Sequence, residues 1–199
     1  MNPMNKIIAI VGMSGVGKTS LAQALAKTGR FATAYEQHAE RPFQSLFKND
    51  RRFALANQLD YFLLRAEQEK DLRQGPAKTG LVDGGLDLDF HGFTRLFHSR
   101  NLLSDPEYDL CQRLYAFIRV SLPRPELIVR LNADFETVAN RLSARDRINI
   151  ASAKDTALFN TFLDEWLATL PSDHLLVLDV TDDDITYSKS IPTILGKLI

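Results

Sequence analysis

The stretch GMSGVGKT, residues 12–19, constrains the fold of this chain more than any other feature. It has the form G-x-x-x-x-G-K-[ST] and lies between a short apolar run and a helical segment, which is the context that the pattern requires. Its glycines allow successive backbone N–H groups to turn inward around phosphate oxygens. Lys18 supplies a positive charge for the β and γ phosphates, and Thr19 supplies a hydroxyl for Mg²⁺. The stretch therefore predicts a nucleoside triphosphate cradle made of Gly12, Ser14, Gly15, Val16, Gly17, Lys18, Thr19 and Ser20.

Short apolar runs alternate with longer helical segments along the rest of the chain. We expect strands at 7–11, 33–36, 81–83, 127–131 and 175–179. We expect helices at 19–28, 50–74, about 91–100, 106–121, 134–145, 154–170 and about 188–198, with Asp134 as an N-cap. The strand segments are continuously apolar, as in a parallel sheet that is covered on both faces. The pattern predicts one domain over residues 1–199 with a three-layer α/β fold of the P-loop NTPase type, in which a five-stranded parallel sheet has helices on both faces.

Charge and cysteine content narrow the range of partners. Lys and Arg total 24 against 25 for Asp and Glu, so the basic excess typical of nucleic-acid binding is absent from the sequence. The single cysteine, Cys111, forms no internal disulfide, which fits a reducing compartment. The apolar run near the N-terminus is too short to span a membrane. We therefore expect a cytoplasmic protein that binds neither a nucleic-acid polymer nor a membrane.

The acceptor of the phosphate must be argued from other segments. A GTPase would need a guanine-reading N-K-x-D, which the sequence lacks, and a motor ATPase would be larger. A small-molecule kinase remains. Glu36 ends the expected second strand, at the sheet edge where ligands bind in such folds, and could accept a proton from an attacking hydroxyl. A solvated acid at a strand end is the alternative.

The expected helix at 50–74 carries an amide, two aromatic rings and a guanidinium on one face: Gln58, Tyr61, Phe62 and Arg65. Such a set could contact a flat heterocycle. The neighbouring residues Leu59, Leu63 and Ala66 are expected to face the core. The alternative is a solvated Arg65 with the aromatic rings in the core.

Two further groups extend this pattern. Arg141, Arg145 and Arg147 lie in the stretch NRLSARDR, and they suit a lid at about 141–153 that closes on the transferring phosphate. An exposed charged helix face is the alternative. Asp89 and Phe93 are four residues apart and are expected to meet Arg65 from the opposite wall of a cleft.

Taken together, these segments resemble the deoxynucleoside kinase family, and the resemblance extends from the phosphate loop to the last strand. The resemblance implies an ATP-dependent, Mg²⁺-requiring transfer of the γ-phosphate to the 5′-hydroxyl of a (deoxy)nucleoside in nucleotide salvage, by a homodimer built on long helices. It implies that Glu36 is the catalytic base and that Lys18, Arg145 and Arg147 stabilise the transferring phosphate, with Arg141 and Arg145 also on the ATP side. Thr19 and Asp83 would hold the metal.

The resemblance also assigns the acceptor side. Gln58, Arg65 and Asp89 would contact the base edge, and Phe93 would stack on the base, beside Tyr61 and Phe62. Phe47 occupies the position of a sugar-binding tyrosine in the family. The stretch LDVTDD, residues 178–183, resembles the loop beside the adenine of ATP.

Several positions depart from the family pattern. An arginine commonly follows the acid at the end of the third strand, and this chain has Gly84 after Asp83. Ile150 stands where the lid usually carries a glutamate, and Asp184 replaces an aromatic residue. Arg119, Arg141 and Arg145 are candidates to replace the missing arginine. The alternatives are a nucleoside monophosphate kinase, another small-molecule kinase on the same fold, or a catalytically impaired nucleotide-binding regulatory protein.

Overall fold

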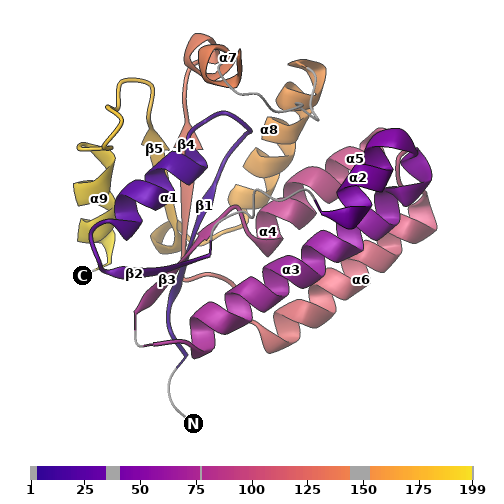
Figure 1. Ribbon diagram of the computed structural model, residues 1–199, viewed down its shortest axis with the longest axis horizontal. Helices are drawn as coiled ribbons and strands as arrows, with labels where there is room; N and C mark the ends of the chain where they lie inside the picture. Colours follow the sequence, from indigo (N-terminus) through magenta and orange to yellow (C-terminus); the bar gives the residue numbers. More distant parts are fainter. Residues whose placement is uncertain (1–3, 35–40, 77, 144–152, 199) are drawn as a thin grey trace.

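Five parallel strands form the centre of the molecule (Figure 1), as predicted. The computed structural model describes residues 4–34, 41–76, 78–143 and 153–198. The strands lie in the order β2-β3-β1-β4-β5. Their bounds are β1 Ile7–Val11, β2 Phe31–Ala34, β3 Thr79–Asp83, β4 Leu127–Asn132 and β5 Leu175–Asp179. Because all five run in parallel, their carboxyl ends share one edge of the sheet, where ligands bind in open α/β folds.

Strand β1 shows why the apolar runs do not alternate with polar residues. Ile8 and Ile10 belong to the apolar cluster on one face of the sheet, while Ile7 and Val11 belong to the cluster on the other face. The first cluster is closed by α1 (Lys18–Ala26) and α9 (Ser190–Lys197), and the second is closed largely by α8 (Ala153–Leu167). Both faces are thus buried, as expected for a parallel sheet covered by helices.

A further helical layer lies beside the sheet. The long helices α3 (Ala54–Gln74) and α6 (Asp105–Ser121) run next to each other at its outer side (Figure 1). Helix α6 begins at a capping box in which Glu107 accepts from the backbone N–H of Ser104 at 2.7 Å. The remaining helical segments are α2 Pro42–Asn49, η1 Arg51–Phe53, α4 Leu86–Leu88, the π-helical turn η2 Asp89–Thr94, α5 Arg95–Ser99, α7 Phe135–Ser143 and η3 Ser172–His174.

Some expected boundaries are wrong. Strand β2 begins at Phe31 rather than at residue 33, since Phe31 is buried and pairs with Thr79. Helix α2 was not expected; it is only eight residues long and none of its residues is fully buried. The helix expected from about residue 91 begins at Leu86. Leu63 is 55% exposed and so does not face the core.

Within the part of the chain that the structure describes, no helix combines the length and the apolar content that crossing a membrane would require.

His91 is a partly buried titratable group between the helical layer and α8. Its ring stacks on Trp166 with centroids 4.9 Å apart, and its Nε2 lies 3.3 Å from the hydroxyl of Tyr115. Burial lowers the pKa of His91 from 6.5 to about 4, and the charges of Arg124, Arg95 and Arg119 add to this effect, whereas Asp87 opposes it. The imidazole is therefore neutral in the folded protein at neutral pH.

This lowered pKa predicts an acid-dependent loss of stability. Because the pKa is lower in the folded state, the stabilising contribution is complete above pH 6.5 and is lost as the pH falls toward about 4. The loss reaches about 3 kcal/mol, from 1.36 kcal/mol for each pKa unit. Denaturant titrations at pH 7 and pH 4 should show a smaller drop in unfolding free energy for His91→Phe, which keeps the stacking ring, than for the parent. Equal drops would contradict the assignment.

Candidate active site

The phosphate loop connects β1 to α1 at the carboxyl edge of the sheet. Gly12, Gly15 and Gly17 all have positive φ angles, of 147°, 84° and 111°. Such angles suit a loop whose N–H groups converge on an anion. The Nζ of Lys18 donates to the carbonyls of Gly12 and Met13, at 3.0 Å each, so the ammonium lies folded over the loop. The predicted phosphate-binding loop is thus present as a turn that leads directly into helix α1.

Thr19 and Asp83 meet beside this loop. The Thr19 hydroxyl donates to Oδ2 of Asp83 at 2.5 Å, and Asp83 is 1% exposed. Strand pairing explains the meeting, since Asp83 ends β3 directly beside Ile10 of β1. A hydroxyl and a carboxylate at the mouth of a phosphate loop are oxygen donors that suit Mg²⁺, which usually takes one or two protein ligands and completes its shell with phosphate and water. The residues present therefore fit the metal expected from the sequence.

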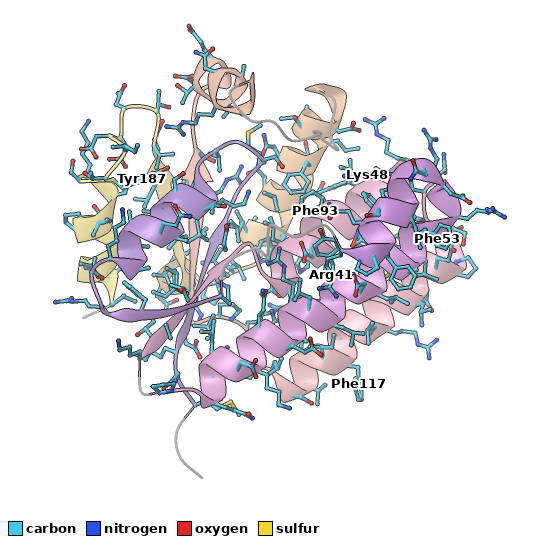
Figure 2. The ribbon with its side chains drawn as sticks, viewed as in Figure 1. Arg41, Lys48, Phe53, Phe93, Phe117 and Tyr187 are labelled. Atoms are coloured by element: carbon cyan, nitrogen blue, oxygen red, sulfur yellow. The ribbon has the colours of Figure 1, made fainter. Side chains whose placement is uncertain are left out.

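Two side chains distant in sequence hold the end of the loop. Arg141 donates from Nη1 to the carbonyl of Val16 at 2.8 Å and from Nη2 to the carbonyl of Val180 at 3.2 Å. The hydroxyl of Tyr187, which lies next to α1 (Figure 2), donates to the carbonyl of Gly17 at 3.1 Å. Sequence reasoning placed Arg141 on the ATP side but missed Tyr187, because a tyrosine 170 residues from the loop belongs to no local pattern.

The Tyr187 contact predicts a defect on the donor side. Tyr187→Phe removes one buried hydrogen bond, worth about 0.5–1.5 kcal/mol, and frees the carbonyl that orients the loop. The KM for ATP should rise about 2–10-fold, with a smaller change in kcat, in steady-state assays at saturating acceptor. Tyr108→Phe, on α6, is the matched control and should behave as the parent. An unchanged KM in Tyr187→Phe would remove the residue from this role.

Two of the residues predicted to bind the acceptor, Arg65 and Asp89, lie in contact. The Nε of Arg65 donates to Oδ2 of Asp89 at 2.9 Å, and its Nη1 donates to the backbone carbonyl of Asp83 at 3.3 Å. Arg65 and Asp89 are each 4% exposed. The expected approach of Arg65 and Asp89 is confirmed, and the alternative of a solvated Arg65 is wrong. Thr19, Asp83, Arg65 and Asp89 therefore form one connected series from the phosphate loop to the helical layer.

The other predicted acceptor residues differ in burial. Phe93 is half-buried and packs on Phe159 of α8, with ring centroids 4.9 Å apart. Phe62 has no exposed surface and packs near Phe90 in an apolar cluster. Phe62 is therefore a core residue, as the alternative interpretation predicted. Gln58 is buried, Tyr61 is half-buried, and half-buried Phe47 packs on Phe97 at 5.0 Å. Their contacts with a ligand remain predictions.

A polar cavity of about 650 Å³ lies at the carboxyl ends of β4 and β5. Its lining residues are Asn132, Ala133, Asp134, Asp179, Thr181, Asp182, Asp183 and Lys189. Arg141 connects this region to the phosphate loop through Val180 and Val16. The side chain of Asp184 is not part of the lining; it accepts from Ser188 and Thr186, and these hydrogen bonds lower its pKa.

Gly84, where the family commonly has arginine, has a φ angle of +86°, a backbone conformation that side-chain-bearing residues rarely adopt. Arg119 does not fill the gap. Its Nε and Nη2 bind the carboxylate of Asp87 at 3.0 and 2.9 Å, and its Nη1 binds Glu69 at 3.0 Å. All three guanidinium nitrogens thus bind carboxylates in a buried ion network. Arg119 is therefore excluded as the residue that replaces the family arginine.

Several predicted site residues lie outside the described residues: Glu36, Arg145, Arg147 and Ile150. The same holds for residues 144–152 of the expected lid.

Comparison with known proteins agrees with this arrangement. A sequence model of the deoxynucleoside kinase family matches residues 8–195. The chain is 25% identical over 203 residues to a deoxyadenosine/deoxycytidine kinase of Bacillus subtilis (strain 168), covering 98% of this chain and 93% of the relative. It is 29% identical over 142 residues to a deoxyadenosine kinase of Dictyostelium discoideum, covering 70% of this chain and 57% of the relative.

Solved structures show the same fold. A deoxyadenosine kinase from M. mycoides, solved with dATP bound, superposes with a TM-score of 0.76 at 20% identity, covering 96% of this chain and 98% of that one. The same M. mycoides enzyme with the products dCMP and dCDP also gives a TM-score of 0.76, at 21% identity and the same coverage. The family match over nearly the whole chain, together with the formed phosphate loop, shows that this protein belongs to the deoxynucleoside kinase family and is an ATP-dependent phosphotransferase that acts on nucleosides.

Proposed function

We propose that this chain transfers the γ-phosphate of ATP to the 5′-hydroxyl of a deoxynucleoside with the help of Mg²⁺. The observation that carries the proposal is the connected series Thr19–Asp83–Arg65–Asp89. It links the phosphate loop to two buried groups that can bind the polar edge of a base. The names of the relatives, which phosphorylate deoxyadenosine and deoxycytidine, support the same class of acceptor.

Each group has a distinct role in this mechanism. The loop amides and Lys18 hold the triphosphate, and Lys18 exchanges its bonds to loop carbonyls for phosphate oxygens. Thr19 and Asp83 would hold Mg²⁺, which would neutralise charge on the phosphates. Glu36 takes the proton of the attacking hydroxyl, and Arg145 and Arg147 stabilise the equatorial oxygens. The roles of these last three residues rest on the sequence.

The two sides of the site hold different parts of the substrates. Arg65 and Asp89 present donors and an acceptor to the base edge, Gln58 contributes its amide, and Phe93 stacks on the ring. The cavity of about 650 Å³ at the carboxyl ends of β4 and β5, which Arg141 links to the phosphate loop, is assigned to the base and ribose of ATP.

An acceptor screen tests this function. The purified protein, with ATP and Mg²⁺, is incubated with deoxynucleosides, ribonucleosides, nucleoside monophosphates and sugars, and products are identified by mass. We expect a 5′-monophosphate from at least one deoxynucleoside. Phosphorylation of monophosphates alone would identify a nucleotide kinase instead. Tight ATP binding without transfer to any acceptor would identify a regulatory protein, an outcome that the loss of arginine at Gly84 would explain.

We infer further that the chain forms a homodimer through α3 and α6. These helices carry large apolar side chains at the surface: Leu63 is 55%, Phe117 72% and Val120 85% exposed. Phe117 projects from the outer side of α6 (Figure 2), and a groove of about 380 Å³ runs between the two helices. An exposed apolar patch of this kind marks an interface, and a two-fold contact would bury it against its own copy.

Light scattering after size exclusion tests the dimer. The parent should elute with twice the chain mass, and Phe117→Asp should elute as a monomer, because it leaves a charge in the interface. Ile185→Asp is the matched control, since Ile185 is 91% exposed outside this helix pair. A parent that stays monomeric at all concentrations would contradict the interface.

The single cysteine, Cys111, is buried and free, which supports a location in the reducing cytosol.

A further inference from the structure

Helix α8 touches both halves of the site through two neighbouring residues. The ring of Phe159 packs on Phe93, with centroids 4.9 Å apart and planes tilted by 54°. The next residue, Asn160, donates from Nδ2 to the sulfur of Met13 at 3.7 Å. Met13 belongs to the phosphate loop, and its carbonyl accepts from Lys18 at 3.0 Å. One turn of α8 therefore lies between the ring assigned to the acceptor base and the lysine assigned to ATP.

The contact of Phe159 with the acceptor side is tight. Phe159 is 4% exposed, and a Cβ added to Gly92 would lie 2.5 Å from its Cε2 and 2.6 Å from its Cζ. Only glycine lets the ring seat against the π-helical turn η2. Turns of this kind are frequent at functional sites. Because Phe93 follows Gly92 directly, the seat of Phe159 sets the position of the Phe93 ring.

Polar contacts tie α8 to the same block of the molecule. The guanidinium of Arg95 lies 4.2 Å from the ring centroid of Phe162 and pairs with Glu165 at 2.5 Å. Arg100 pairs with Asp155 at 2.6 Å. Since both arginines follow η2 along the chain, η2, α5 and α8 are joined at several points. A shift of the Phe93 ring would therefore move α8 as a whole rather than the Phe159 side chain alone.

We propose that Phe159 and Asn160 are positioning residues that couple binding of the nucleoside to the state of the phosphate loop. The proposal rests on the proposed function, in which Phe93 stacks on the acceptor base. A base stacked on Phe93 restricts the position of the Phe159 ring and of α8, and the hydrogen bond from Asn160 then restricts the position of Met13. Lys18 must give up its hydrogen bond to the Met13 carbonyl before it can bind phosphate. A restricted Met13 therefore changes the affinity of the loop for ATP. By linkage, ATP changes the affinity for the nucleoside by the same factor.

Calorimetry of the full-length protein measures this coupling. The Kd of a nucleoside that the acceptor screen shows to be phosphorylated is determined with and without a non-hydrolysable ATP analogue and Mg²⁺. The coupling factor is the ratio of the two values, and for the parent we expect at least about fivefold. In Asn160→Ala and Phe159→Leu the factor should fall by about threefold or more. For Asn160→Ala, the Kd of each ligand alone should stay within about twofold of the parent, a separation that a merely structural role would not produce.

A matched control lies on the same helix. Thr161→Ala changes an exposed neighbour whose hydroxyl bonds within α8, and it should keep the coupling factor of the parent. An uncoupled parent, or an unchanged factor in Asn160→Ala and Phe159→Leu, would overturn the inference while phosphorylation of the nucleoside left the proposed function standing. If no nucleoside is bound or phosphorylated, the proposed function fails and the coupling falls with it.

Discussion

Replacing Glu36 by glutamine is expected to lower kcat about 10²–10⁴-fold, the usual contribution of a general base. Strand β2 supports this expectation. Ala34, the last described residue before Glu36, pairs with Val82, so β2 reaches the edge of the sheet at which β3 ends in Asp83. The amide keeps the size of the side chain but cannot take the proton of the attacking hydroxyl. Initial rates at saturating ATP and deoxynucleoside measure the loss.

ATP binding separates this effect from damage to the fold. The Kd of a fluorescent ATP analogue should remain within about twofold of the parent, since Glu36 has no role in holding the triphosphate. Glu67→Gln, at an exposed position of α3, makes the same chemical change away from the site and should leave kcat unaltered. A Glu36→Gln enzyme that turns over within a factor of two of the parent would remove Glu36 from the base role.

The second large effect concerns stability. Arg119→Met should lower the unfolding free energy by about 3–5 kcal/mol, because it leaves two buried carboxylates without their main cation. Asp87 and Glu69, each with a side chain only 3% exposed, bind Arg119 at 2.9 and 3.0 Å. Burial raises the pKa of Glu69 even with Arg119 present, so loss of the arginine raises it further. For a chain of this size the melting temperature should fall by about 6–20 °C.

Arg113→Met is the matched control on the same helix. Arg113 is 75% exposed and lies 3.9 Å from Asp109, and an exposed pair of this kind contributes about 0–1 kcal/mol. Thermal unfolding at one fixed protein concentration compares the two variants. Melting temperatures within about 2 °C of each other would show that the buried network contributes no more than a surface pair.

Local patterns were sufficient to predict the sheet and the phosphate loop. Strands β1 and β5 and the loop have their expected positions because apolar runs and the spacing of glycines, lysine and threonine carry the necessary information. The meeting of Arg65 with Asp89 was also predicted, since both positions follow from the spacing of the family motifs.

Features that depend on long-range packing could not be predicted. Charged residues are ordinarily exposed, so nothing local shows that the side chains of Asp87, Glu69 and Arg119 are buried together. Leu63 was assigned to the core because hydrophobic periodicity does not distinguish the core from an apolar surface. The hydrogen bond of Tyr187 to the loop joins segments 170 residues apart, and neither segment carries a local sequence pattern that predicts it.

The backbone at Gly84 makes the loss of the family arginine hard to reverse. A Cβ there would meet Leu88 and Arg65 at ordinary contact distances of 3.4 and 3.6 Å, so space alone does not forbid a side chain. The left-handed φ angle does oppose one, at a cost on the order of 1–3 kcal/mol, and an arginine would also begin beside the guanidinium of Arg65. An arginine introduced at this position would therefore carry that backbone cost together with repulsion from the neighbouring guanidinium.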